Sequence, residues 1–169
     1  MSIEKQLESI INKKVGEFIS NSFNDRLLNK VGKAARDQVV KRTRLGKGVK
    51  KPGGGPARKL KSLQEITVIY RGEYKENLSP LTRPRKSNLT ATGQLLDSIS
   101  YKIIKRGQKK SLRLYFKENR RFELDGTPAK ISHKRINKQV EKNGRSFFYL
   151  AGFELKKLSS IIFDALNKR

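Results

Sequence analysis

Hydrophobic positions recur every three or four residues in two stretches near the start of the chain. Residues 2–20 and residues 23–40 both place their apolar side chains on one face at this spacing, which predicts two amphipathic helices or one interrupted long helix. A basic amphipathic helix can also lie on a membrane surface. Here the acidic Glu4 and Glu8 and the wide apolar face of the first stretch favour packing against protein.

A different pattern begins in the middle of the chain. Thr92 is a candidate N-cap for a short helix, and Leu95, Leu96 and Ile99 fall on one side of that helix. Apolar and polar residues then alternate on both sides of Gly107, which predicts two strands and a turn. The apolar members of this alternation are Tyr101, Ile103, Leu112, Leu114 and Phe116. We therefore expect a capped helical turn that leads into a β-hairpin.

The last third of the chain contains two further predicted elements. Phe122 and Leu124 predict a short third strand. Residues 128–145 are polar and basic and fit either a short helix or a surface loop, in which we expect His133, the only histidine, to be solvated. Apolar residues recur at helical spacing from residue 153 to residue 166 and predict a terminal amphipathic helix.

These elements predict an α+β fold in one domain of residues 1–169. N-terminal amphipathic helices would precede a small antiparallel sheet of three or four strands. The C-terminal helix would pack on that sheet, because so small a sheet is stable only when one face is covered. Residues 58–71 fit either a helix or a strand, and the three-residue steps of their apolar positions favour a helix.

Composition adds a strong positive charge to this picture. Forty Lys and Arg residues stand against fifteen Asp and Glu, for a formal net charge of +25. Such an excess favours binding to polyanions by neutralisation of phosphates, or to acidic protein surfaces. The chain has no cysteine, which excludes disulfides and thiolate chemistry. No signal peptide is evident, and no stretch approaches the roughly 20 apolar residues of a membrane span, so we expect no membrane partner.

The basic residues are densest between residues 41 and 61, where nine Lys and Arg residues occur with no acidic residue. Three glycines between two prolines in residues 52–56 argue against regular structure. This loop lacks the Gly-Lys-Ser/Thr ending of a nucleotide-binding loop. We predict a flexible basic loop at about residues 45–58 that contacts DNA backbone or a neighbouring subunit; a solvated linker is the alternative. The candidate contact residues are Lys47, Lys50, Lys51, Arg58, Lys59 and Lys61.

No arrangement of residues indicates catalysis. Carboxylate pairs, His-based dyads and metal-ligand clusters with meaningful spacing are absent from the sequence, so we expect no enzyme activity, no cofactor and no metal. Phe147 and Phe148 could stack on nucleic-acid bases, but their apolar neighbours favour core packing.

Two segments resemble the neck and tail-completion proteins, which join head to tail in tailed bacteriophages. The run SNLTATGQLLDSI (residues 87–99) is similar to that family's threonine-glycine-leucine…serine-isoleucine signature. The run GRSFFYLAGFELKKLSSIIFDAL (residues 144–166) is similar to its closing motif, an arginine and paired aromatics before a terminal helix. ELDGT (residues 123–127) carries the glycine expected after the last hairpin strand, whereas Ser146 replaces a usual proline. The motif core comprises Leu89, Gly93, Leu95, Ile99, Phe147 and Phe148.

The resemblance covers roughly residues 55–169 and implies a structural virion protein at the head–tail junction, made in the host cytoplasm. Identical subunits would form a ring, of which a hexamer is one candidate, through which DNA passes. Its partners would be neighbouring neck, connector or tail-tube proteins and the backbone of double-stranded DNA. The position on the head side or the tail side stays open. A free basic nucleic-acid-binding protein, architectural or ribosome-associated, fits the composition equally well.

Overall fold

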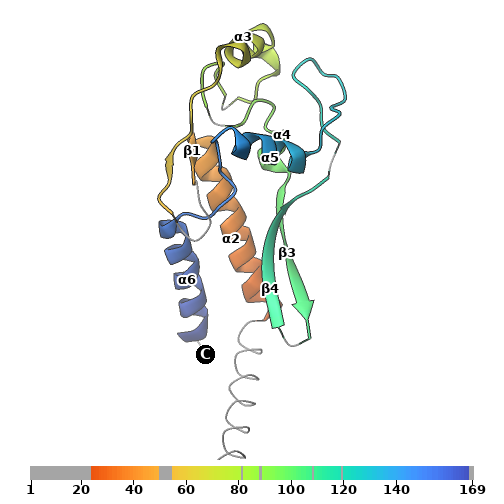
Figure 1. The fold of residues 1–169 in the computed structure, drawn as a ribbon. Helices are drawn as coiled ribbons and strands as arrows, with labels where there is room; N and C mark the ends of the chain where they lie inside the picture. Colours follow the sequence, from red (N-terminus) through yellow and green to blue (C-terminus); the bar gives the residue numbers. More distant parts are fainter. Residues whose placement is uncertain are drawn as a thin grey trace, which may run out of the picture.

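The computed structural model describes residues 24–49, 55–80, 82–87, 89–107, 109–118 and 120–167. The first predicted helix, residues 2–20, lies outside these residues. The elements in chain order are α2 (Asp25–Arg44), β1 (Lys47–Gly48), β2 (Arg58–Lys59), α3 (Glu65–Glu73), the 3-10 helix η1 (Lys75–Asn77), α4 (Gln94–Asp97), β3 (Ile99–Arg106), β4 (Lys109–Phe116), α5 (His133–Lys142) and α6 (Gly152–Asn167). Figure 1 shows α2 in the lower part of the molecule, between α6 and the β3–β4 hairpin, with α3 at the opposite end.

Helix α2 is the central element and confirms the second predicted helix. The side chain of Asn24 caps it by accepting a hydrogen bond from the backbone N–H of Leu27 at 2.9 Å, which satisfies one of the free donors at a helix start. Asp25 in the first turn and basic residues in the last turn complement the helix dipole. Buried residues recur every three or four positions along it, namely Leu27, Leu28, Val31, Ala35 and Val39.

The predicted hairpin is confirmed. Strands β3 and β4 pair antiparallel from Ile99–Phe116 to Arg106–Lys109, and Gly107 at the turn has a φ of 58°. The hairpin lies close against α2, because a Cβ atom at Gly32 would meet the Tyr101 ring at 2.4 Å. The glycine at position 32 therefore has a packing role in a helix that it would otherwise weaken.

The short helix before the hairpin forms, but its predicted cap is wrong. Gly93, not Thr92, occupies the N-cap position of α4, with a φ of 81°. That left-handed backbone favours glycine, so the conformation rather than a capping hydroxyl starts the helix. Leu96 and Ile99 are buried, and Leu95 is partly buried against the same cluster.

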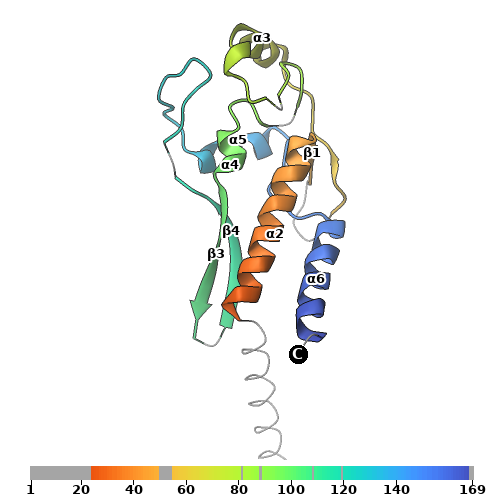
Figure 2. The same ribbon diagram turned by 180° about the vertical axis from the view of Figure 1, so that it is seen from behind.

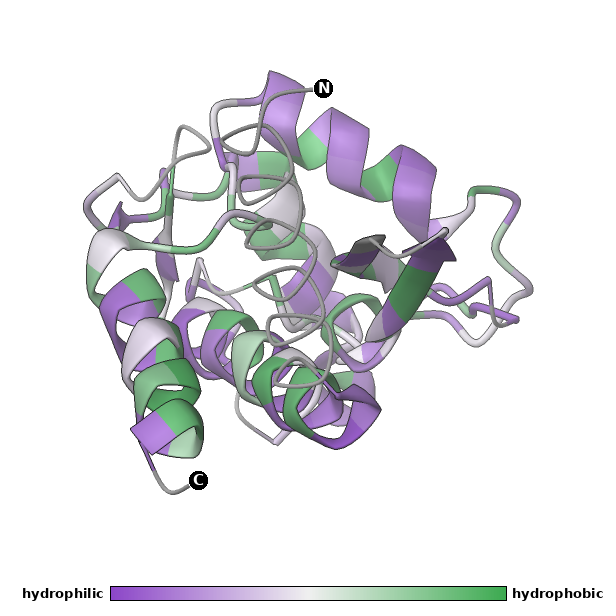
Figure 3. Ribbon diagram, turned by 90° about the horizontal axis from the view of Figure 1, so that it is seen from below, coloured by the Kyte–Doolittle hydropathy of each residue, from purple (hydrophilic) through white to green (hydrophobic). Residues whose placement is uncertain are grey.

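Helix α6 confirms the predicted terminal helix, but its packing partner differs. It lies along α2, on the side away from the hairpin, as both ribbon views show (Figures 1 and 2). Leu158 joins Leu27, Val31 and Ala35 of α2 in one buried cluster. Hydrophobic and hydrophilic residues both lie along α6, which ends beside the C-terminal label in Figure 3. The prediction that this helix packs on the sheet is therefore wrong: α2 lies between them.

The fold is mixed helix and sheet, as expected, with fewer strands per sheet than predicted. The described residues form two antiparallel sheets of two strands each, β1–β2 and β3–β4. The expected third strand at Phe122 and Leu124 reduces to one bridge between Phe122 and Pro128. A turn follows at once, with Gly126 at a φ of 82°, so the chain leaves the extended conformation before a strand develops.

Three further predictions concern the helices of two segments and the exposure of the histidine. The helix predicted within residues 58–71 is confirmed only from Glu65, since the preceding residues form β2 and an extended segment. Residues 128–145 contain helix α5, the first of the two alternatives. His133, expected to be solvated, is only 2% exposed at the start of α5.

Candidate polyanion interface

The segment predicted as a flexible loop at residues 45–58 has an ordered base. Strand β1 pairs with β2 in a short antiparallel ribbon, and the backbone N–H of Leu60 donates to the Gly46 carbonyl at 2.7 Å. Lys50, Lys51, Gly53 and Gly54 lie outside the described residues. The irregular structure predicted for the proline- and glycine-rich run stays a prediction, while β1 and β2 show regular structure on both sides of that run.

Apolar residues explain why the ribbon is ordered. Val49 is fully buried and Leu60 is 7% exposed. The Val49 N–H donates to the Ser146 carbonyl at 3.0 Å, and a Cβ at Gly48 would lie 2.2 Å from that carbonyl oxygen. The ribbon is thus fixed to the segment that follows α5, at the position where the resembled motif usually has proline.

The four described candidate contact residues all face solvent: Lys47, Arg58, Lys59 and Lys61. Lys47 lies directly opposite Lys59 across the ribbon, and Gly48 lies opposite Arg58. Like charges directly opposite each other repel, and the ribbon itself carries no acidic residue to offset them. This concentration of cations suits an anionic partner more than an isolated surface.

The two segments that carry the family resemblance meet in one cluster. Leu89, Leu96 and Ile99 from the first segment pack with Phe147 from the second, together with Val39 and Leu60. Leu95 and Phe148 are partly buried against this cluster. The Phe148 ring stacks on Phe116 with ring centroids 4.4 Å apart, so the paired aromatics serve the core, as predicted, rather than a base-stacking surface.

A buried ion pair lies beside this cluster. The Arg42 guanidinium donates to the Glu154 carboxylate and to the backbone carbonyls of Phe147 and Tyr149. The Glu154 carboxylate also accepts from the Ala151 N–H at 2.7 Å. Burial lowers the pKa of Arg42, and the charge of Glu154 opposes that shift. This junction joins the end of α2 to the start of α6 and is structural.

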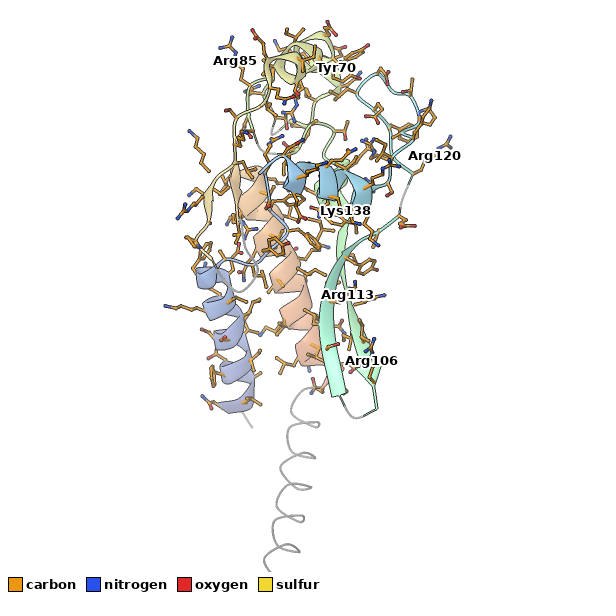
Figure 4. The ribbon with its side chains drawn as sticks, in the orientation of Figure 1. Tyr70, Arg85, Arg106, Arg113, Arg120 and Lys138 are labelled. Carbon is orange, nitrogen blue, oxygen red and sulfur yellow. The ribbon has the colours of Figure 1, made fainter. Side chains whose placement is uncertain are left out.

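Positive charge extends over the whole length of the molecule. Figure 4 shows Arg85 near α3, Arg106 near the far end of the hairpin, and Arg113 between these ends. In the part of the chain that the structure describes, six ion pairs involve five carboxylates. Most cations in the chain therefore have no carboxylate available, since forty face fifteen acids in all.

Three further cations, which the sequence did not indicate as contact residues, lie close to Lys61 or to one another. Lys142 and Arg145 line a cavity together with the predicted Lys61, and the buried Arg71 lies close to Arg145. A usable signal was present, because Arg71 follows the apolar run Val68-Ile69-Tyr70 and Arg145 is the arginine of the resembled closing motif.

The described residues contain no group of three or more His, Cys, Asp or Glu side chains that could hold a metal ion. No helix among them has both the length and the apolar character to cross a membrane. Comparison with known proteins identified no matching family model, no matching curated protein and no matching solved structure. The function is therefore inferred from the residues of this chain and their arrangement.

Proposed function

We propose that this chain is a structural protein of the head–tail junction of a tailed bacteriophage, where identical subunits form a ring around the DNA. One observation carries this proposal: the two segments that resemble the neck and tail-completion family form a single unit. Leu89 and Ile99 from residues 87–99 share a buried cluster with Phe147 from the closing segment. Arg145 donates to the Ser87 hydroxyl at 2.8 Å across the same junction. Motifs of one fold are expected to meet in this way.

Exposed apolar residues support association into a ring. On α3, Ile66 is 70% exposed and Ile69 is 53% exposed. On α6, Phe153 and Phe163 are 51% and 63% exposed. These patches lie on different parts of the molecule (Figure 1). Two different patches allow head-to-tail contacts between identical subunits, and such contacts close into a ring when the rotation permits.

The positive charge of the chain supports the passage of DNA through that ring. Contacts from lysine and arginine to phosphates carry no sequence information, which suits a protein through which any DNA sequence passes. The exposed cations of the β1–β2 ribbon, Lys47, Arg58 and Lys59, are our candidates for these contacts.

Sedimentation of the purified chain at high salt tests the ring. We expect one closed oligomer, and the double variant Ile66→Ser/Ile69→Ser should weaken association by tenfold or more, because each buried aliphatic side chain contributes about 1.5–3 kcal/mol. Leu45→Ser is the matched control, since Leu45 is 64% exposed but lies at the end of α2, outside both patches.

The alternative, a free basic nucleic-acid-binding protein, predicts a different result. That protein would stay monomeric at every concentration and would bind DNA with a strong dependence on salt. A monomer with unchanged behaviour in the Ile66→Ser/Ile69→Ser variant would overturn the ring and favour this alternative.

A further inference from the structure

A cavity of about 450 Å³ lies between the start of α3 and the end of α5. We call it the α3–α5 cavity. Three cations line it, Lys61, Lys142 and Arg145, together with the polar side chains of Ser62, Gln64 and Thr67. None of the described residues that line it is acidic. Its charge is therefore uniformly positive.

Arg145 is the most enclosed of the three cations. Its Nη2 donates to the Ser87 hydroxyl at 2.8 Å, and that hydroxyl donates to the Lys61 carbonyl. The Nε of Arg145 is buried and has no hydrogen-bond partner. Burial lowers the pKa of Arg145. A buried donor without a partner costs free energy, so the Arg145 guanidinium is incompletely neutralised and incompletely hydrogen-bonded by the described residues.

A second guanidinium lies close to Arg145. Arg71 of α3 is 5% exposed, and its Nη1 donates to the Lys86 carbonyl at 3.0 Å. Burial and the positive charge of Arg145 lower the pKa of Arg71 to about 10. Arg71 thus stays protonated at neutral pH, and the two like charges repel each other.

No carboxylate neutralises this pair within the part of the chain that the structure describes, because neither Arg71 nor Arg145 belongs to an ion pair there. Arginine is rarely fully buried unless it is paired, and burial of an unpaired charge is costly. Two adjacent guanidiniums without a carboxylate are therefore best explained by an anion from outside the chain.

The start of α3 adds a positive end to the same cavity. Gln64 occupies the N-cap position and lines the cavity, and its side chain makes no capping hydrogen bond. The start of a helix favours anions. Glu65 in the first turn is exposed and does not line the cavity.

We propose that the α3–α5 cavity binds one phosphate-class oxyanion. Arg145 supplies the main charge-assisted hydrogen bonds, the exposed Lys61 and Lys142 add charge from the lining, and Arg71 adds positive charge close to Arg145. Arginine suits this ligand because its planar donors match phosphate oxygens. Free phosphate and a DNA phosphodiester share this chemistry; the choice of DNA as the physiological source rests on the proposed function.

Calorimetric titration with inorganic phosphate, at constant ionic strength set by chloride, tests the cavity. Wild-type protein should bind phosphate, and Arg145→Gln should lower the affinity about tenfold or more through loss of charge-assisted hydrogen bonds. Arg106→Gln removes the same charge from an exposed hairpin residue and should retain binding. This control separates a site from the general attraction of a +25 chain for anions.

A second variant serves if Arg145→Gln fails to fold. Lys61 and Lys142 are both exposed, so Lys61→Gln/Lys142→Gln should fold and should weaken phosphate binding severalfold. Wild-type protein that shows no phosphate binding, or equal affinity in wild type and both cavity variants, overturns the proposal.

Duplex DNA distinguishes the two sources of phosphate. Each neutralised phosphate adds about 0.9 to the slope of log affinity against log salt, so Arg145→Gln should reduce that slope by about one unit if DNA occupies the cavity. An unchanged slope together with lost phosphate binding assigns the cavity to free phosphate. Phosphate titration does not depend on ring formation. A protein that forms a ring but binds no phosphate would overturn only the cavity proposal. A strict monomer that binds phosphate would overturn only the ring proposal.

Discussion

Arg42 and Arg71 lie in two different parts of the molecule and are buried to almost the same degree, but they differ in the groups that surround their charge. Arg42 is 4% exposed and has a carboxylate, Glu154, and two backbone carbonyls as partners. Arg71 is 5% exposed, with one backbone carbonyl as a partner and a second arginine, Arg145, close by. Burial is equal, so the difference lies in how the charge is neutralised.

This difference separates a charge that serves the fold from one that is available to a ligand. The Arg42–Glu154 pair joins α2 to α6 within the body of the molecule, and its hydrogen bonds are internal. The Arg71–Arg145 pair lies beside a cavity near α3, where an anion can enter. A buried charge therefore indicates a candidate ligand site only when the partners of that charge within the fold leave it without a counterion.

The largest expected effect comes from breaking the neutralised pair. Glu154→Gln should destabilise the protein by about 3–5 kcal/mol, because it leaves the Arg42 charge buried without a counterion. Denaturant unfolding measures this loss. The matched control is Asp37→Asn, which breaks the exposed Arg36–Asp37 pair and should cost less than about 1 kcal/mol.

Replacement of both partners tests the same point from the other side. Arg42→Met/Glu154→Leu removes the charges together and should recover part of the loss, since apolar pairs of similar volume often replace buried ion pairs at little cost. A Glu154→Gln variant as stable as the wild type would show that Arg42 needs no counterion, and the contrast with Arg71 would disappear.

A smaller effect is expected at Arg71, for which the described residues supply no counterion. In phosphate-free buffer, Arg71→Met should change the free energy of unfolding by no more than about 1 kcal/mol, because loss of the hydrogen bond to the Lys86 carbonyl is offset by relief of repulsion with Arg145. Parallel denaturant curves of the variant and wild type measure this. A loss as large as that of Glu154→Gln would indicate that Arg71, like Arg42, is neutralised within the fold.

Apolar spacing was sufficient to predict the elements that bury one face of their own. Apolar residues recur every three or four positions in α2 and α6 and alternate with polar residues in the hairpin. Each of these patterns indicates that one face of the element is buried. The pattern does not record what covers that face. The C-terminal helix was therefore predicted, while its place on α2 instead of the sheet was not.

Local composition failed where single distant contacts decide the structure. Prolines, glycines and lysines predicted an irregular loop, yet the burial of Val49 and Leu60 orders its two ends. The cavity was missed for a similar reason: Lys61, Arg71 and Arg145 are far apart in sequence, and only the fold brings them together. His133 was expected in solvent because its sequence neighbours are polar, although it is buried close to Lys117 and Arg121.

His133 shows a third way to bury a basic group, which is to leave it neutral. It is 2% exposed and its Nε2 has no hydrogen-bond partner. Burial and the nearby charge of Arg121 lower its pKa below the ordinary value of 6.5, and a hydrogen bond with the Lys117 backbone partly opposes this shift. Arg42 is thus neutralised by a counterion and Arg71 stays charged beside a cavity, whereas the His133 imidazole stays neutral.

The smallest predicted effect follows from that depressed pKa. The unfolded chain takes up a proton near pH 6.5, whereas folded His133 does so only at lower pH. Stability should therefore be full above this value and should fall as the pH drops from it through the folded pKa. His133→Asn, neutral at every pH, should be less stable at neutral pH but should lose less stability between about pH 7 and about pH 5. The lowered pKa values of Asp25 and Asp125 place their titration below this window. Melting curves of wild type and variant with the same pH dependence would show that His133 is not held neutral by its burial, and only the two arginine sites would then differ in how they treat a buried charge.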